Sequence, residues 1–245
     1  MSPPITLAAL SIPALLVVSA SPGAGATVAA GAIADALRRG GSRVGVCVPI
    51  AMRCVHRREG LVSEDAESLA VCADSAHPLD LIAPMRYAED LLPNIAARRS
   101  GRAVEWESID RATQLVARDA DVMILRAPAT LLTPLDEATT TLDLARQLRA
   151  PIVIVTRAGG EAVNQCSMTA AVARSAGLRV AGIMVNRYPA ESASIAEEAS
   201  LREIEKWSKA ALLCVLPEER FVPPALPAGV VAAAGMVDWA RLAGG

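Results

Sequence analysis

The stretch Ser19-Ala-Ser-Pro-Gly-Ala-Gly-Ala-Thr27 lies between the apolar run Leu15–Val18 and a segment with helical periodicity. Phosphate-binding loops occupy this place, between a buried strand and a helix. In the pattern G-x-x-x-x-G-K-[ST], backbone N–H groups surround phosphate oxygens, a lysine adds charge and a hydroxyl binds magnesium. Gly25 and Thr27 fit this pattern, whereas Ser19 replaces the first glycine and Ala26 replaces the lysine. These residues alone fit both an ordinary glycine-rich turn and a phosphate loop without its lysine.

Composition limits the possible architectures and partners. The chain has 245 residues and a formal net charge of -2. We find no repeat or linker, and expect one domain over residues 1–245, with an N-terminal tail (1–13) and a loosely attached C-terminal segment (223–245). The near-neutral charge and the 2% aromatic content argue against a nucleic-acid or anionic-membrane surface. The apolar stretch 5–20 lacks a basic flank and runs into the glycine loop, so we expect a cytoplasmic protein rather than a signal peptide or membrane span.

The cysteines and histidines support neither a disulfide framework nor a zinc site. No two cysteines form a C-x-x-C pair, and the chain has only two histidines. We expect reduced core thiols at Cys47, Cys54, Cys72, Cys166 and Cys214.

Apolar runs rich in β-branched residues alternate with helical segments along the chain. This alternation predicts a doubly wound α/β fold, with a mostly parallel sheet and helices on both faces, similar to P-loop NTPases. The runs are continuously hydrophobic, as in strands that are buried on both faces. The expected strands are Leu15–Ser19, Arg43–Val48, Asp121–Leu125, Ile152–Thr156, Val180–Asn186 and Ala211–Leu216. The expected helices are Val28–Arg39, Ser108–Arg118, Thr140–Leu148, Ala162–Ala176 and Ile195–Lys209.

Ligands of such sheets bind beyond the carboxyl ends of the strands, and the residues there form an ordered series of motifs. The series runs Gly23–Thr27, Val48–Ile50, Asp65-Ala66, Leu131–Leu135, Ala150–Val155, Asn164, Ala181–Ile183, Val185–Pro189 and Val215–Glu218. Through this series, over roughly residues 15 to 220, the chain resembles dethiobiotin synthetase. That enzyme uses ATP to carboxylate 7,8-diaminononanoate and to close the ureido ring of the biotin precursor.

The resemblance implies a ligand set. It implies Mg-ATP as cofactor, with the loop glycines Gly23 and Gly25 at the phosphates. Thr27 and Asp65 correspond to magnesium ligands. Adenine would be read at Asn186, Pro217 and Glu218. A homodimer and a diaminononanoate-like small molecule are the implied partners.

The same comparison shows which residues are missing. The two lysines of the family fall at Ala26 and Val48, and its metal-binding glutamate falls at Arg126. Substrate-side positions also differ, at Pro22, Met52 and the turn 159–162. Carboxylation followed by phosphoryl transfer builds negative charge that lysines and Mg²⁺ must stabilise. A divalent ion needs anionic oxygen ligands, and Arg126 supplies a cation instead.

We therefore expect a dethiobiotin synthetase homologue with no intact catalytic residue and with weak or absent Mg-ATP binding. Such a chain would act as a binding or regulatory module, or as a partner subunit in a homodimer or in a heterodimer with an intact paralogue. The alternative is an active ATP-dependent ligase that uses replacement groups such as Arg126. A third possibility is a different ligand, bound without ATP.

Each candidate residue also has a purely structural interpretation. Asp65 can cap a helix that starts at Ala66. Thr27 can be an ordinary first-turn residue, and Asn186 can form a turn. Arg126 is either a drift substitution or a phosphate clamp, since a guanidinium group matches phosphate oxygens.

Overall fold

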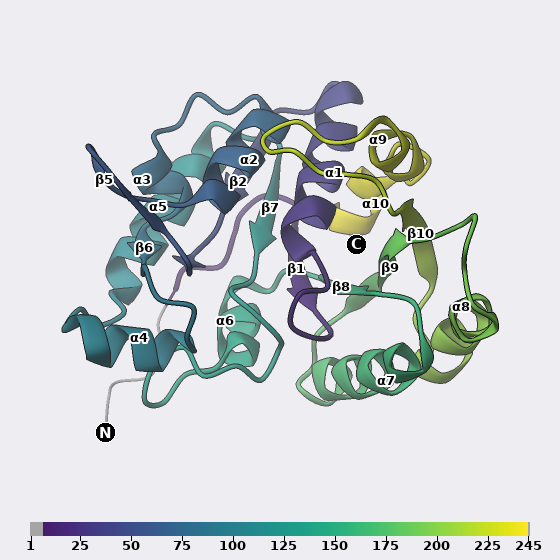
Figure 1. The fold of residues 1–245 in the computed structure, drawn as a ribbon. Helices are drawn as coiled ribbons and strands as arrows, with labels where there is room; N and C mark the ends of the chain where they lie inside the picture. Colours follow the sequence, from purple (N-terminus) through teal and green to yellow (C-terminus); the bar gives the residue numbers. More distant parts are fainter. Residues whose placement is uncertain (1–6, 245) are drawn as a thin grey trace.

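The computed structural model describes residues 7–244 and is built around a parallel sheet of six strands (Figure 1). The strand order is β10-β9-β8-β1-β7-β2, and every neighbouring pair is parallel. This sheet confirms the predicted fold class and all six predicted runs. Its strands are β1 (Ala14–Ser19), β2 (Val44–Cys47), β7 (Val122–Arg126), β8 (Ile152–Thr156), β9 (Val180–Tyr188) and β10 (Leu212–Pro217).

Helices cover both faces of this sheet, and the core is therefore divided into two layers. Along β1, Leu15 and Val17 pack into one layer while Leu16 and Val18 pack into the other, because successive strand side chains point to opposite faces. The first layer includes residues of α1 (Ala26–Arg39), α2 (Glu64–Ala73), α3 (Leu79–Ile82), α9 (Ala228–Ala234) and α10 (Trp239–Gly244). The second includes residues of α4 (Pro93–Ser100), α5 (Trp106–Arg118), α6 (Thr141–Leu148), α7 (Gly160–Ser175) and α8 (Ile195–Ser208).

The segment between β2 and α5 contains short elements that the sequence analysis did not predict. A parallel pair joins β3 (Ile50–Ala51) to β6 (Met85–Arg86), and a small hairpin joins β4 (Val55–Arg57) to β5 (Gly60–Val62). Elements this short carry too few residues for a recognisable period. The hairpin leads directly into α2, which begins at Glu64 and carries Asp65 in its first turn. Ser63, rather than Asp65, caps this helix by accepting a hydrogen bond from the Ala66 N–H.

The C-terminal segment packs tightly, and the prediction of a loosely attached segment at 223–245 is wrong for the part that the structure describes. Val230, Ala234 and Trp239 are buried in the layer that contains α1. The Trp239 indole Nε1–H donates to the Ala234 carbonyl at 2.8 Å. The abundance of Pro, Ala and Gly suggested a loosely attached loop and helix, but small side chains also let helices pack closely. Residues 1–6 of the predicted tail, and residue 245, lie outside the described residues.

Among residues 7–244, no helix has the length and apolar composition that a membrane span requires.

Candidate functional site

The glycine loop connects β1 to α1 at the carboxyl edge of the sheet (Figure 1). Gly23 and Gly25 have φ angles of 74° and 89°, in the left-handed region that favours glycine. Gly25 is the N-cap of α1, and no side chain caps the helix. Among the hydrogen bonds of the described residues, none uses the backbone N–H groups of residues 25–28. The amino end of a 14-residue helix is thus left open, which is the arrangement that attracts anions.

Asn186 supports this loop from β9. Its side chain is almost fully buried, with 1% of the residue exposed, and its Nδ2 donates to the Ala24 carbonyl at 2.9 Å. A Cβ atom at Gly25 would lie 2.0 Å from the same Nδ2 atom, so the loop lies directly against Asn186. The structure therefore places this predicted adenine residue in contact with the loop backbone.

Thr27, Asp65 and Arg126 meet at the start of α1, although they are far apart in sequence. The Thr27 hydroxyl donates to Asp65 Oδ1 at 2.9 Å. Arg126 forms an ion pair with the other carboxylate oxygen, with 2.8 Å between Nη2 and Oδ2. Its Nε–H donates to the Thr27 hydroxyl oxygen at 3.3 Å. The two predicted magnesium ligands are therefore brought together, and a guanidinium group is bound to both.

The Arg126 side chain is only 10% exposed, so its charge is held in a poorly solvated place. Burial lowers the pKa of the Arg126 guanidinium, whereas the Asp65 carboxylate raises it and the charge of Arg53 lowers it further. Arg53 follows the changed substrate-side residue Met52 and was not singled out from the sequence. Among the described residues, Arg126 Nη1 is buried and finds no acceptor. The guanidinium is therefore paired on one side and unsatisfied on the other.

These residues do not fit a magnesium ion. Both oxygens of Asp65 are already engaged, Oδ1 by a hydrogen bond from Thr27 and Oδ2 by the ion pair with Arg126, and the Thr27 hydroxyl is both donor and acceptor. The positive charge of Arg126 lies against the two groups that would bind the metal, and a hard cation needs anionic oxygen ligands there. Within the described part of the chain, no group of three or more His, Cys, Asp or Glu residues could hold a metal ion.

The positions of the two missing lysines are closed to solvent. Ala26 is 5% exposed in the first turn of α1, and Val48 is fully buried after β2, with its N–H donating to the Ile82 carbonyl at 2.7 Å. The remaining predicted adenine residues lie where β10 ends. Pro217 is half-buried, and Glu218 is exposed and pairs loosely with Arg157 at 4.0 Å.

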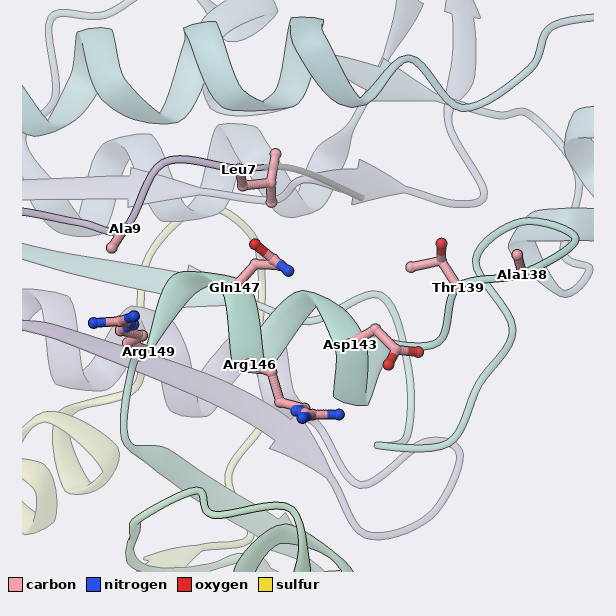
Figure 2. Close-up of a pocket in the computed structure, with 8 residues that line it drawn as sticks. All are labelled: Leu7, Ala9, Ala138, Thr139, Asp143, Arg146, Gln147 and Arg149. Atoms are coloured by element: carbon pink, nitrogen blue, oxygen red, sulfur yellow. The ribbon is translucent and has the colours of Figure 1, made fainter. Parts of the chain in front are cut away.

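Two cavities lie outside this cluster. The smaller one, of ≈ 260 Å³, is lined by Ser21 of the glycine loop and by the altered turn 159–162, among others. The larger one, of ≈ 500 Å³, lies between the segment 7–9 and α6. Figure 2 shows that the charged groups of Asp143, Arg146 and Arg149 point in different directions around it. Apart from the substrate-side turn 159–162, none of the residues predicted for the phosphate, magnesium or adenine sites lines either cavity.

Comparison with known proteins identifies the family of this chain. A family model described as an AAA domain matches residues 13–225. The ATP-dependent dethiobiotin synthetase of Anaeromyxobacter dehalogenans strain 2CP-1 is 34% identical over 156 residues, which are 63% of this chain and 69% of the relative. The enzyme of Streptomyces coelicolor is 31% identical over 208 residues, 84% of each chain.

Solved structures show the same fold at low sequence identity. The septum site-determining protein MinD of Pyrococcus horikoshii, complexed with Mg-ADP, has a TM-score of 0.53 and 17% identity, covering 95% of this chain and 94% of that one. A ParA family ATPase from Chlorobium tepidum has a TM-score of 0.57 and 16% identity, covering 95% and 99%. The fold is therefore that of P-loop NTPases, and the chain belongs to the family of ATP-dependent dethiobiotin synthetases.

Proposed function

We propose that this member of the family has lost the ligase reaction and acts as a non-catalytic binding or partner subunit. The observation that carries the proposal is the Arg126 guanidinium, which lies 2.8 Å from Asp65 and contacts Thr27. A tethered cation in this position occupies the two groups that the resemblance assigns to magnesium. A Mg²⁺ ion bound to the same two groups would lie against the buried Arg126 side chain, and Coulomb repulsion between the two cations opposes this.

The chemistry of the family depends on the charges that this chain lacks. Carbamate formation, phosphoryl transfer and ring closure concentrate negative charge on oxygen atoms, and preorganised cations stabilise it. Loss of one such donor lowers the rate by about 10²–10³-fold. Ala26 and Val48 stand at both lysine positions, and these effects need not add because the groups act as one unit. Even the effect of one lysine makes ordinary turnover unattainable.

A direct assay tests this proposal. The purified chain is supplied with 7,8-diaminononanoate, labelled bicarbonate and Mg-ATP, and dethiobiotin is measured against the Streptomyces coelicolor relative as positive control. We expect no product above background and no low-micromolar, magnesium-dependent ATP binding by calorimetry. Turnover at the rate of the control enzyme would contradict the proposal.

A revertant gives a sharper test of the cause. Exchanging Ala26→Lys and Arg126→Glu together restores the lysine and the metal carboxylate, so Mg-ATP should bind more tightly than to the parent. Each exchange alone should do little, because lysine, carboxylate and metal act together. A double revertant that folds normally but binds Mg-ATP no better than the parent would show that the loss of binding has another cause, such as the altered turn 159–162.

One observation favours an active enzyme as the second candidate. Arg126 Nη1 has no acceptor among the described residues, so a phosphate oxygen is a possible partner for it. If Arg126 clamps phosphate in a working ligase, Arg126→Ala abolishes a measurable turnover in the assay above. Absence of turnover in the parent removes this candidate.

The proposed partners remain a homodimer or a heterodimer with an intact paralogue. Sedimentation of the chain alone, and mixed with an active family member, distinguishes the two assemblies.

A further inference from the structure

The amino end of α1 combines two features that point to an anion. The N–H groups of residues 25–28 are without acceptors among the described residues, and the helix carries no side-chain cap. A Cβ atom built on Gly23 meets no atom within 4 Å, so the space beside the loop is open there. Backbone N–H groups that converge at the start of a helix bind phosphate oxygens in many proteins.

The second feature is independent of the helix. Arg126 is nine-tenths buried, it contacts the first turn of α1 through Thr27, and its Nη1 has no acceptor among the described residues. A buried donor without a partner carries an unrecovered desolvation cost, so a cation kept in this state favours a ligand that brings an acceptor. The Arg126 Nε–H donates to the Thr27 hydroxyl oxygen, so the charge of Arg126 lies close to the loop.

From these two features, and resting on the proposed function, we propose that the loop binds a phosphate-bearing anion without any divalent cation. Arg126 is the tethered replacement for the metal. The resemblance assigns the hydroxyl of Thr27 and the carboxylate of Asp65 to a magnesium ion, which would supply positive charge for the phosphates. Here the guanidinium contacts the hydroxyl of Thr27 and the carboxylate of Asp65, and it is covalently attached to β7.

The local charges indicate how many phosphate groups this site accommodates. Arg126 is partly neutralised by Asp65, and Arg53 is 62% exposed and lies 3.9 Å from Asp90. The start of α1 contributes about half a positive charge. So small a net positive charge suits a single phosphate group. The triphosphate of ATP would leave several negative charges without a partner. The ligand class is therefore inorganic phosphate or a monophosphate ester.

Calorimetric titration with inorganic phosphate tests the inference. It is carried out once in EDTA and once in excess magnesium chloride, with adenosine monophosphate and ATP as further arms. We expect phosphate to bind in EDTA, and we expect added magnesium to change the dissociation constant by less than about twofold, because the site does not use the metal. Tighter binding of adenosine monophosphate than of phosphate identifies a nucleotide as the source of the phosphate group.

Variants then assign the effect to Arg126. Arg126→Met should weaken phosphate binding by about tenfold or more, because it removes a charge-assisted donor. Arg126→Lys keeps the charge without the fork and should give an intermediate loss, which covers the case in which Arg126→Met does not fold. Arg146→Met is the matched control, because it removes one arginine from the larger cavity and should leave binding unchanged (Figure 2).

Three results would overturn the inference: no phosphate binding in EDTA, binding that requires magnesium, or unchanged binding in the Arg126 variants. These results are separate from the ligase assay. Magnesium-dependent binding without dethiobiotin formation defeats only this inference, whereas turnover of the diamine defeats the proposed function.

Discussion

Removing the Arg126 charge should destabilise the fold, because it leaves Asp65 without its cation. The two side chains are 10% and 23% exposed and are joined by a 2.8 Å contact. Breaking one side of a buried ion pair costs about 3–5 kcal/mol, and the partial exposure of Asp65 places Arg126→Met near the lower limit, at about 3 kcal/mol. In a domain of this size that is a fall in Tm of about 6–12 °C.

The measurement is urea unfolding followed by circular dichroism, on four proteins that form a double-mutant cycle. The double variant Arg126→Met with Asp65→Asn removes both charges and should recover to within about 1 kcal/mol of the parent, since a neutral pair avoids the unpaired buried charge. The coupling energy should exceed about 1.5 kcal/mol.

The exposed pair of Arg43 and Asp121 is the matched control. Its contact is shorter, at 2.6 Å, but its side chains are 69% and 47% exposed. Arg43→Met should therefore cost less than about 1 kcal/mol. If Arg126→Met unfolds at the same urea concentration as the parent, or if the double variant is no more stable than the single one, the buried pair does not hold Asp65 in place and the reasoning fails.

Three further predictions concern single positions. Val48→Lys should lower stability by several kcal/mol in the same urea assay, because it forces an ammonium group into a fully buried place. Gly25→Ala should lower the free energy of unfolding by more than about 1 kcal/mol, since φ is 89° and the new Cβ lies 2.0 Å from Asn186 Nδ2. Adding Asn186→Ser to this variant removes the contact and should recover part of the lost stability. No recovery would refute the packing argument. NMR titration should give Asp121 a pKa of about 2, set by hydrogen bonds from the side chain and the backbone N–H of Arg43, and Arg43→Met should raise this pKa toward the ordinary range while the backbone N–H still donates. Because the folded pKa is the lower one, this contribution to stability is present above the ordinary carboxyl pKa and is lost as pH falls toward 2, and an unshifted Asp121 would contradict it.

The strands were predictable because each contains a continuous apolar run, and the central ones are buried on both faces of the sheet. The run Ile152–Thr156, for example, is buried along its whole length and appears in the sequence with the same bounds. The short pair β3 and β6 was not predictable, since two residues in each strand carry no period. The C-terminal segment was misinterpreted because composition alone does not reveal that Trp239 reaches the core.

In the candidate site, too, some features were predictable from the sequence and others were not. The missing lysine at Ala26 and the arginine at position 126 are local facts that pattern comparison finds without a structure. The ion-pair partner of that arginine cannot be predicted from the neighbouring residues in the sequence. Arg126 lies opposite Val17 because β7 pairs with β1, and Asp65 arrives on a helix that follows a hairpin outside the main sheet.

The amino-acid sequence by itself therefore determined the parallel sheet, the glycine loop and the residues Ala26, Val48 and Arg126 at its edge, because these depend on periodicity and on residue identity at fixed spacing. Only the tertiary structure decided that Arg126 contacts both Thr27 and Asp65. Arg126 and Asp65 lie 99 and 38 positions after Thr27 along the chain, and no local sequence rule relates the three residues. The register of β7 on β1 and the packing of α2 against α1 bring their charged atoms within hydrogen-bond distance.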